Sequence, residues 1–211
     1  MGRPYARLRF LIVSGPTREP IDPVRYLSNY STGVMGKNLV AAARSRGHRV
    51  EWVDCPRRAE TALELERLLK RLVPKCDVLV MAAGVADARP AKFSGTKIKK
   101  NRLQTIRLVK NPDILAGLAK RKKKRQVFIG FGLESEDLVR RGAGKLERKG
   151  LELIVLQNVT AKKKPFGDRA IDAVLMGVRG RIEKRRSITK KRLASELIRR
   201  AERIFAVKNG I

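Results

Sequence analysis

A short run of apolar residues, Val78 to Met81, limits the folds that this chain can adopt. The run is continuous rather than alternating, which is typical of a strand buried on both faces of a parallel sheet. Small residues follow it directly, from Ala82 to Gly84, and leave the backbone open to a ligand. Ligands of open α/β sheets bind beyond the carboxyl ends of the strands. We therefore expect a site in the segment from Ala83 to Asp87.

Strand and helix patterns alternate along most of the chain. Apolar runs predict strands at 9–14, 49–53, 78–81, 127–130 and 153–156. Helical spacing predicts helices at 35–46, 61–72, 112–120 and 138–149, and a last helix to about residue 205. Segments 173–178 and 181–185 are expected to form an antiparallel hairpin. This order predicts an α/β protein with a three-layer Rossmann-like fold, in which helices cover both faces of a mainly parallel sheet that ends in a C-terminal antiparallel hairpin.

The first predicted turn does not fit a dinucleotide-binding protein. Such a fold carries GxGxxG at this place, whereas residues 14–36 read SGPTREPIDPVRYLSNYSTGVMG. A hydride-transferring oxidoreductase is therefore disfavoured. The many hydroxyl, amide and charged groups suit an anion site at a helix N-terminus. A polar surface loop with a capping Ser or Thr explains the same residues, and the sequence leaves both interpretations open.

A lysine-rich segment follows the central strand, at about 91–109. Its lysines, Lys92, Lys97, Lys99 and Lys100, surround Gly95. We expect a mobile tongue that closes over a strongly anionic substrate, within a single domain that spans residues 1–211. A solvated loop is the simpler interpretation on spacing alone.

The formal net charge is +30, from 50 Lys and Arg against 20 Asp and Glu. Such an excess attracts polyanions, so nonspecific nucleic acid is one expected partner. Aromatic residues that stack on bases make up 5% of the chain, and no nucleic-acid-binding motif is present. These two observations disfavour specific recognition of bases. Because of the charge alone, nonenzymatic association with nucleic acid is kept as the alternative function.

Other features predict a cytoplasmic protein with reduced thiols. No run of about 18 apolar residues predicts a membrane span, and the N-terminus carries neither a signal-peptide nor a myristoylation pattern. Cys55 and Cys76 lack metal-binding spacing, so we expect structural thiols. His48 has no partner motif and is expected to be a turn residue rather than a base.

Six motifs occur in register: the first-turn sequence, MAAGVADARP, KIKK, KNPDI, GF and KLERKG. Together they resemble the phosphopantothenate-cysteine ligase family, also called phosphopantothenoylcysteine synthetase, over residues 12–159. In many bacteria this domain is the second half of a bifunctional flavoprotein, and the chain resembles the stand-alone ligase form, for which no flavin is expected. The resemblance implies a step of coenzyme A biosynthesis in which 4'-phosphopantothenate is joined to L-cysteine. The reaction uses CTP in most bacteria and ATP in eukaryotes, passes through an acyl-nucleotidylate and releases pyrophosphate. The co-substrate expected here is CTP rather than ATP, and Mg2+ is implied with it.

The resemblance also implies roles for individual residues. Asn29 would donate hydrogen bonds to the carbonyl of the intermediate, and Lys97 would neutralise the triphosphate as the acyl-nucleotide forms. Arg25 would contact the phosphopantothenate site of a neighbouring subunit, which implies a homodimer. The expected phosphopantothenate-binding residues are Arg25, Asn29, Ala83, Gly84 and Asp87. The expected nucleotide-binding residues are Gly15, Asp87, Lys97, Asn111, Pro112, Asp113, Ile114, Phe131, Lys145 and Lys149. The metal ligands are not identified.

The chain departs from the family pattern at several motif positions, among them residues 132–135, which read GLES where the family more typically has AAET. Pro16, Gly84 and Gln157 stand where the family usually has glycine, alanine and asparagine. None of these departures replaces Asn29 or Lys97, so the ligase expectation is kept.

Overall fold

A seven-stranded sheet forms the centre of the protein, whose structure is a computed structural model that describes residues 7–160 and 164–211. The strand order is β11-β10-β9-β8-β5-β1-β4. The strands are β1 (Arg9–Pro16), β4 (Arg49–Asp54), β5 (Val78–Gly84), β8 (Val127–Glu134), β9 (Leu153–Asn158), β10 (Ile171–Gly177) and β11 (Ile182–Ile188). The strands from β9 to β4 are parallel, and β10 runs antiparallel to both β9 and β11. The predicted parallel sheet with a C-terminal antiparallel hairpin is confirmed.

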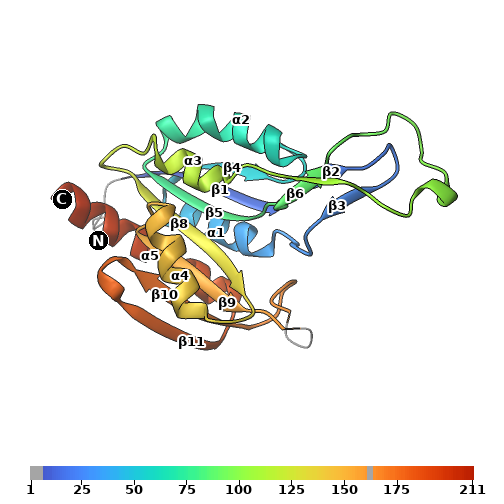
Figure 1. Cartoon of the computed structure of the whole chain (residues 1–211). Coiled ribbons are helices and arrows are strands. Elements are labelled where there is room, and N and C mark those ends of the chain that lie inside the picture. Colours follow the sequence, from blue (N-terminus) through green and yellow to red (C-terminus); the bar gives the residue numbers. More distant parts are fainter. Residues whose placement is uncertain (1–6, 161–163) are drawn as a thin grey trace.

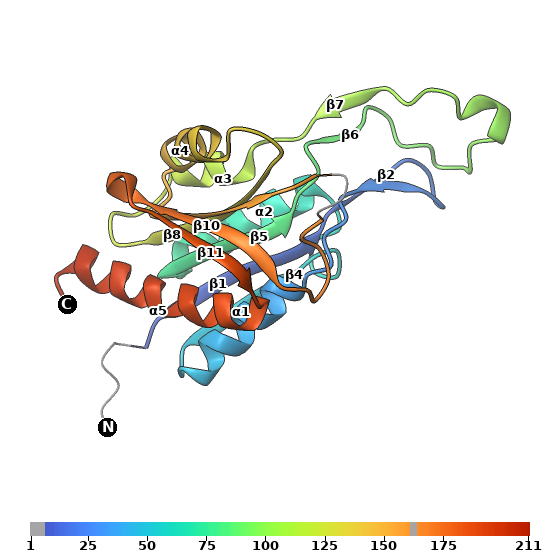
Figure 2. The same cartoon turned by 90° about the horizontal axis from the view of Figure 1, so that it is seen from below.

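Helices cover both faces of this sheet (Figures 1 and 2). One face carries α1 (Val34–Ser45) and α5 (Lys190–Asn209). The other face carries α2 (Ala62–Leu72), α3 (Ile114–Ala119) and α4 (Leu138–Arg148). The central strand β5 shows why a layer of helices forms on each face of the sheet. Its alternate residues Val78 and Val80 pack under α1 and α5, whereas Leu79 and Met81 pack under the other helices. The predicted three-layer architecture is confirmed.

Two small hairpins, which the sequence did not predict, project from the carboxyl edge of the sheet (Figure 2). The first pairs β2 (Arg18–Pro20) with β3 (Tyr26–Ser28), and the second pairs β6 (Ala88–Pro90) with β7 (Leu108–Lys110). The lysine-rich segment connects β6 to β7 and includes a 3-10 turn at Lys100–Arg102. Residues 108 and 109 belong to β7, so the connecting segment is 91–107 rather than 91–109.

Polar side chains cap the starts of α3 and α5. The cap of α3 is Asp113, whose Oδ1 accepts a hydrogen bond of 3.1 Å from the backbone N–H of Ala116. Asn111 also suits a cap by residue type, but its side chain is bound to the Ala86 carbonyl oxygen instead. Thr189 caps α5, because its Oγ1 accepts a hydrogen bond of 3.3 Å from the Arg192 N–H.

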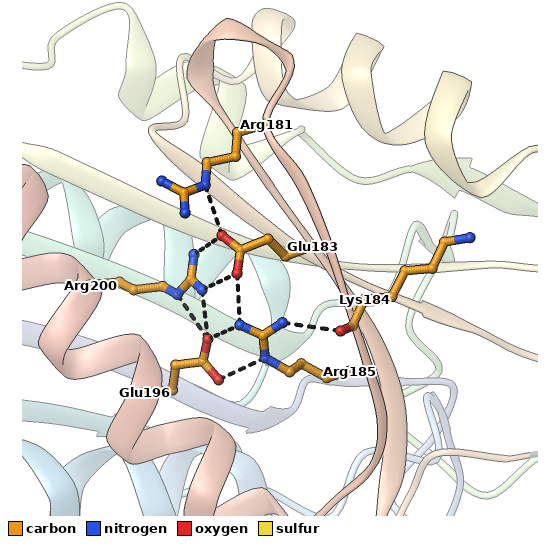
Figure 3. A network of polar contacts seen from close by, with 6 residues as sticks. All are labelled: Arg181, Glu183, Lys184, Arg185, Glu196 and Arg200. Atoms are coloured by element: carbon orange, nitrogen blue, oxygen red, sulfur yellow. Dashed lines mark hydrogen bonds and ion pairs between the residues drawn. The ribbon is translucent and has the colours of Figure 1, made fainter.

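Charged side chains attach the edge strand β11 to α5 (Figure 3). The carboxylate of Glu183 accepts hydrogen bonds from Arg200 and Arg185, and Arg185 also donates to Glu196 of α5. Hydrogen bonds from Arg200 and then Arg185 lower the pKa of Glu183 to about 2. The network thus replaces apolar packing where the sheet meets solvent.

The two cysteines and the histidine are buried and structural. Burial raises the pKa of the Cys55 and Cys76 thiols to about 12, and both are free, as expected. His48 accepts a hydrogen bond from the Leu8 N–H at Nδ1, and its Nε2 lies 2.7 Å from Oε1 of Glu202. Among the described residues, none of the helices has both the length and the apolar character to cross a membrane.

Candidate functional site

A cleft of about 460 Å³ opens at the carboxyl ends of β5 and β8. The chain leaves β1 toward β4 on one side and returns to β5 on the other, so the direction of the connections reverses between β1 and β5. Ligands of open α/β sheets bind at such a reversal. The predicted site residues that line the cleft are Asn29, Ala83, Gly84, Asp87, Asn111, Pro112, Asp113, Ile114, Phe131, Lys145 and Lys149.

Asn29 lies on one wall of the cleft, directly after β3. Its side-chain Nδ2 donates a hydrogen bond of 3.0 Å to the carbonyl oxygen of Val85. The turn that carries Asn29 lies close to β5, because a Cβ at Gly84 would approach the Cβ of Ser31 to 2.8 Å. The glycine found where the family usually has alanine therefore permits this close approach.

Two hydroxyl groups hold this wall in place. Thr17 is fully buried, and its Oγ1 accepts a hydrogen bond of 3.0 Å from the Ala86 N–H. Ser28 Oγ donates to the carbonyl oxygen of Thr17 at 2.6 Å. The interpretation that a Ser or Thr caps the following helix is wrong, since the N-cap of α1 is Gly33 and no side chain caps it. The start of α1 instead lines a smaller cavity of about 130 Å³ beside the cleft.

Two lysines enter the opposite side of the cleft from α4 and its C-terminal end. The Lys149 ammonium lies 3.1 Å from Oδ1 of Asp113. Lys145 forms an ion pair with Oε1 of Glu134, a buried carboxylate that Arg141 also approaches to 3.6 Å. Both lysines thus line the cleft while their charges are offset by the Glu134 and Asp113 carboxylates.

The turn after β5 presents a carboxylate to the cleft. Asp87 is exposed, and its side chain makes no hydrogen bond or ion pair with the residues that the structure describes. Asn111 fixes this turn from behind, because its Nδ2 donates to the Ala86 carbonyl at 2.9 Å and its backbone N–H donates to the Asp87 carbonyl at 2.8 Å. The Asn111 side chain therefore positions Asp87.

Three predicted site residues do not line the cleft. Gly15 is buried, has φ +83°, and would place a Cβ 2.1 Å from the carbonyl oxygen of Cys55. Its conformation serves the turn after β1. Arg25 and Lys97 lie on the two projecting hairpins.

Arg25 and Lys97 are nevertheless held near each other. Arg25 donates to the Asp22 carboxylate and to the Ile98 carbonyl oxygen, the latter at 2.7 Å. The Ile98 N–H donates in turn to Asp22 Oδ2. These hydrogen bonds, chiefly that from Arg25, hold the pKa of Asp22 far below its usual range. The residue next to Lys97 is thus fixed to Arg25.

Two aromatic residues of the cleft could not be identified from the sequence motifs. Tyr30 and Phe166 both line it, with ring centroids 5.9 Å apart, and the Lys164 ammonium lies 4.8 Å from the centroid of the Tyr30 ring. The buried Lys190 donates to the Pro165 carbonyl oxygen at 2.9 Å and so supports this loop. Residues 161–163 lie outside the described residues. An aromatic residue in a polar segment, as Phe166 is here, is a usable signal for a ligand wall.

Among residues 7–160 and 164–211, no group of three or more His, Cys, Asp or Glu is placed to hold a metal ion.

The family model for the DNA/pantothenate metabolism flavoprotein C-terminal domain matches residues 5–204. The chain belongs to this family. A curated relative, the coenzyme A biosynthesis bifunctional protein CoaBC of Escherichia coli (strain K12), is 40% identical over 174 residues, which covers 75% of this chain and 43% of the relative. A cysteine/cysteine sulfinic acid decarboxylase from an unknown prokaryotic organism is 35% identical over 211 residues, which covers 94% of this chain and 59% of that protein. The chain thus spans about half the length of the curated relatives it matches.

Solved structures share the whole fold. The C-terminal domain of a coenzyme A biosynthesis bifunctional protein CoaBC superposes with a TM-score of 0.77 at 26% identity, covering 96% of this chain and 98% of that one. Cab2 in complex with phosphopantothenate-cysteine superposes with a TM-score of 0.71 at 14% identity, covering 97% of this chain and 89% of that one. At that identity, the likeness to Cab2 concerns the fold alone.

Proposed function

We propose that this chain is a ligase of coenzyme A biosynthesis that joins 4'-phosphopantothenate to L-cysteine by way of an acyl-nucleotidylate. The observation that carries the proposal is the composition of one cleft. Asn29, Asp87 and the pair Lys145 and Lys149 line it together, although they are far apart in the sequence. Membership of the DNA/pantothenate metabolism flavoprotein C-terminal domain family supports this assignment.

In the first half-reaction, a carboxylate oxygen of phosphopantothenate attacks the α-phosphorus of the nucleotide, and pyrophosphate leaves. Both reactants are anionic, so the step needs cations near the phosphates. Lys145 and Lys149 line the cleft and are bound to Glu134 and Asp113. Bound phosphates would draw these ammonium groups away from the carboxylates. Before phosphates bind, the same carboxylates balance the charge of the two lysines.

In the second half-reaction, the cysteine amine attacks the acyl carbonyl, and the nucleoside monophosphate leaves. Negative charge develops on the carbonyl oxygen and requires a hydrogen-bond donor. The Asn29 amide has two N–H groups, and one of them is directed to the Val85 carbonyl oxygen. That bond fixes the amide so that its second N–H can donate to the intermediate.

The cation and the nucleotide complete the proposal. Mg2+ would be held mainly by phosphate oxygens, with Asp87 as the cleft carboxylate that lacks a partner among the described residues. Its role would be to neutralise charge on the phosphates. We propose CTP rather than ATP as the nucleotide, no flavin, and a reaction in the cytoplasm.

We further propose a homodimer in which Arg25 and Lys97 act in the cleft of the second copy. Neither residue lines the cleft of its own chain, and both lie on hairpins that project beyond the sheet. Ile98, the neighbour of Lys97, is bound to Asp22 and Arg25. A dimer that places Arg25 in the cleft of the second copy would therefore place Lys97 near the same cleft.

Pyrophosphate release tests the proposed reaction. Purified protein would be supplied with phosphopantothenate, cysteine, Mg2+ and either CTP or ATP, and each component would be omitted in turn. Release that requires phosphopantothenate supports the ligase, and the faster nucleotide identifies the co-substrate. Release that is independent of phosphopantothenate, or no release with either nucleotide, would refute it.

A further inference from the structure

The end of the sheet opposite the cleft carries a cluster of cations, which we call the basic edge and define as Arg9, the segment 120–125 and Lys208. In both views this end, where α5 finishes, lies away from the projecting hairpins (Figures 1 and 2). The segment 120–125 reads KRKKKR and contains no acid. The proposed reaction gives this cluster no role.

Hydrogen bonds and ion pairs bring the members of the basic edge together. Arg9 and Arg125 both bind Oδ1 of Asp77, at 3.0 and 2.9 Å. Lys122 and Lys208 both contact Glu152. Each of these carboxylates is thus shared by two cations, so the contacts do not neutralise the surface.

The shared carboxylates are also shielded from solvent. The Asp77 side chain is 7% exposed, whereas the Arg9 and Arg125 side chains are 49% and 56% exposed. A molecule that approaches this end therefore meets the guanidinium groups rather than the carboxylate. Because Asp77 already orients both arginines, less side-chain entropy is lost when they bind an anion.

Further cations extend the surface without any acidic partner. Lys120, Arg121 and Lys124 are exposed, and their side chains make no ion pair with the described residues. Lys123 donates to the Pro74 carbonyl oxygen at 3.0 Å, which fixes the segment against the 3-10 turn Val73–Lys75. The result is a row of positive charges on an anchored loop.

We propose that the basic edge binds the phosphate backbone of nucleic acid, independently of the cleft. The large exposed aromatic residues of the described chain, Tyr26, Tyr30 and Phe93, lie on the hairpin and cleft side and not at this edge. Among the described residues this edge therefore offers no large exposed aromatic ring for base stacking, and recognition is through phosphates without sequence preference. Duplexes, which present their phosphates on the outside, fit this chemistry.

A charge-neutralised variant tests the proposal. Lys120→Gln, Arg121→Gln and Lys124→Gln would be combined, because these side chains hold no ion pair whose loss would unfold the protein. The matched control, Lys184→Gln, Arg186→Gln and Lys191→Gln, removes the same charge from exposed positions on β11 and α5. The probes are a fluorescent RNA duplex and a DNA duplex of unrelated sequence, followed by anisotropy from low to moderate salt.

We expect the basic-edge variant to bind both duplexes at least about tenfold more weakly, with a salt slope shallower by about three, whereas the control changes less than about twofold. Pyrophosphate release, measured separately, should be unchanged in the variant. Equal loss in variant and control would assign binding to net charge and overturn the proposal. No duplex binding near 0.1 M salt, or variant-sensitive binding to phosphatidylserine vesicles alone, would also overturn it.

Discussion

The Asp22 carboxylate accepts a hydrogen bond of 3.1 Å from the backbone N–H of Ile98, 76 residues further along the chain. The same carboxylate accepts hydrogen bonds of 2.9 Å from the N–H groups of Val24 and Arg25. It is fully buried, so these donors replace the water that an ionised group requires. The bond to Ile98 therefore ties the two projecting hairpins into one unit.

Asp22→Asn should release the lysine-rich segment 91–107. The Asn amide would place N–H groups where Asp22 Oδ2 now accepts hydrogen bonds from the Arg25 side chain and the Ile98 N–H. Donor would then face donor, and the link between the two hairpins would be lost. We expect faster tryptic cleavage at Lys97, Lys99 and Lys100 and turnover lower by at least about tenfold, because Lys97 is no longer positioned. Gln104→Ala, an exposed change in the same segment, is the control. Unchanged cleavage rates would contradict the role of Asp22.

Asn29→Asp should stop the reaction after the first half. The carboxylate would face the Val85 carbonyl oxygen and donate nothing to the intermediate. We expect pyrophosphate release in a single turnover, accumulation of the acyl-nucleotide, and overall turnover lower by about a hundredfold or more. Quench-flow with mass spectrometry would detect the intermediate. Normal product formation would remove Asn29 from the mechanism.

Lys97→Gln should abolish the first half-reaction, because the triphosphate loses a cation that the proposal assigns to it. Mixing this variant with Asn29→Asp tests whether Lys97 acts across a dimer. If Lys97 acts across the dimer, each mixed dimer contains one intact site and one site that lacks both groups. About half of the dimers in an equal mixture are mixed, so activity should recover to about one quarter of the wild-type value. Recovery would fail if Lys97 served the cleft of its own chain. Pyrophosphate release at the native rate from Lys97→Gln alone would show that the segment is a solvated loop.

Gly15→Ala should destabilise the fold more than a comparable change at Gly180. Both glycines have positive φ, +83° and +72°, so alanine is strained at either position by about 1–2 kcal/mol. At Gly15 the new Cβ would also lie 2.1 Å from the Cys55 carbonyl oxygen, whereas at Gly180 no atom lies within 4 Å. Urea unfolding should show an additional loss of about 1–3 kcal/mol at Gly15. Equal losses would mean that the turn relaxes without cost.

Acid should weaken the attachment of β11 through Glu183. Its pKa is about 2 in the folded protein and 4.5 ordinarily, so its contribution to stability is complete above pH 4.5 and is lost as the pH falls toward 2. The free energy of unfolding of Glu183→Gln should therefore approach that of the wild type across this interval. Glu147→Gln, an exposed glutamate without an ion pair among the described residues, is the control. A constant difference between pH 5 and pH 3 would contradict the low pKa.

The order of strands and helices could be predicted because it depends on local periodicity. The run from Val78 to Met81 is apolar at every position, since each face of β5 packs against helices. The small residues after it correctly located one wall of the cleft. Most of the residues that the family resemblance implied line the same cavity, whereas Gly15, Arg25 and Lys97 do not.

The hairpins, the tie at Asp22 and the cap of α3 were decided only by the tertiary structure. Asn111 and Asp113 are both good caps by residue type, but the Asn111 amide is bound to the Ala86 carbonyl oxygen 25 residues away. Likewise, Asp22 and Thr17 are polar residues that residue type alone would place at the surface. In the folded protein they are buried and accept hydrogen bonds from distant N–H groups. The sequence by itself determined which segments bury apolar side chains, because that pattern repeats within a few residues. It could not determine which polar group meets which, because each hydrogen bond depends on a partner that only the folded chain brings within reach.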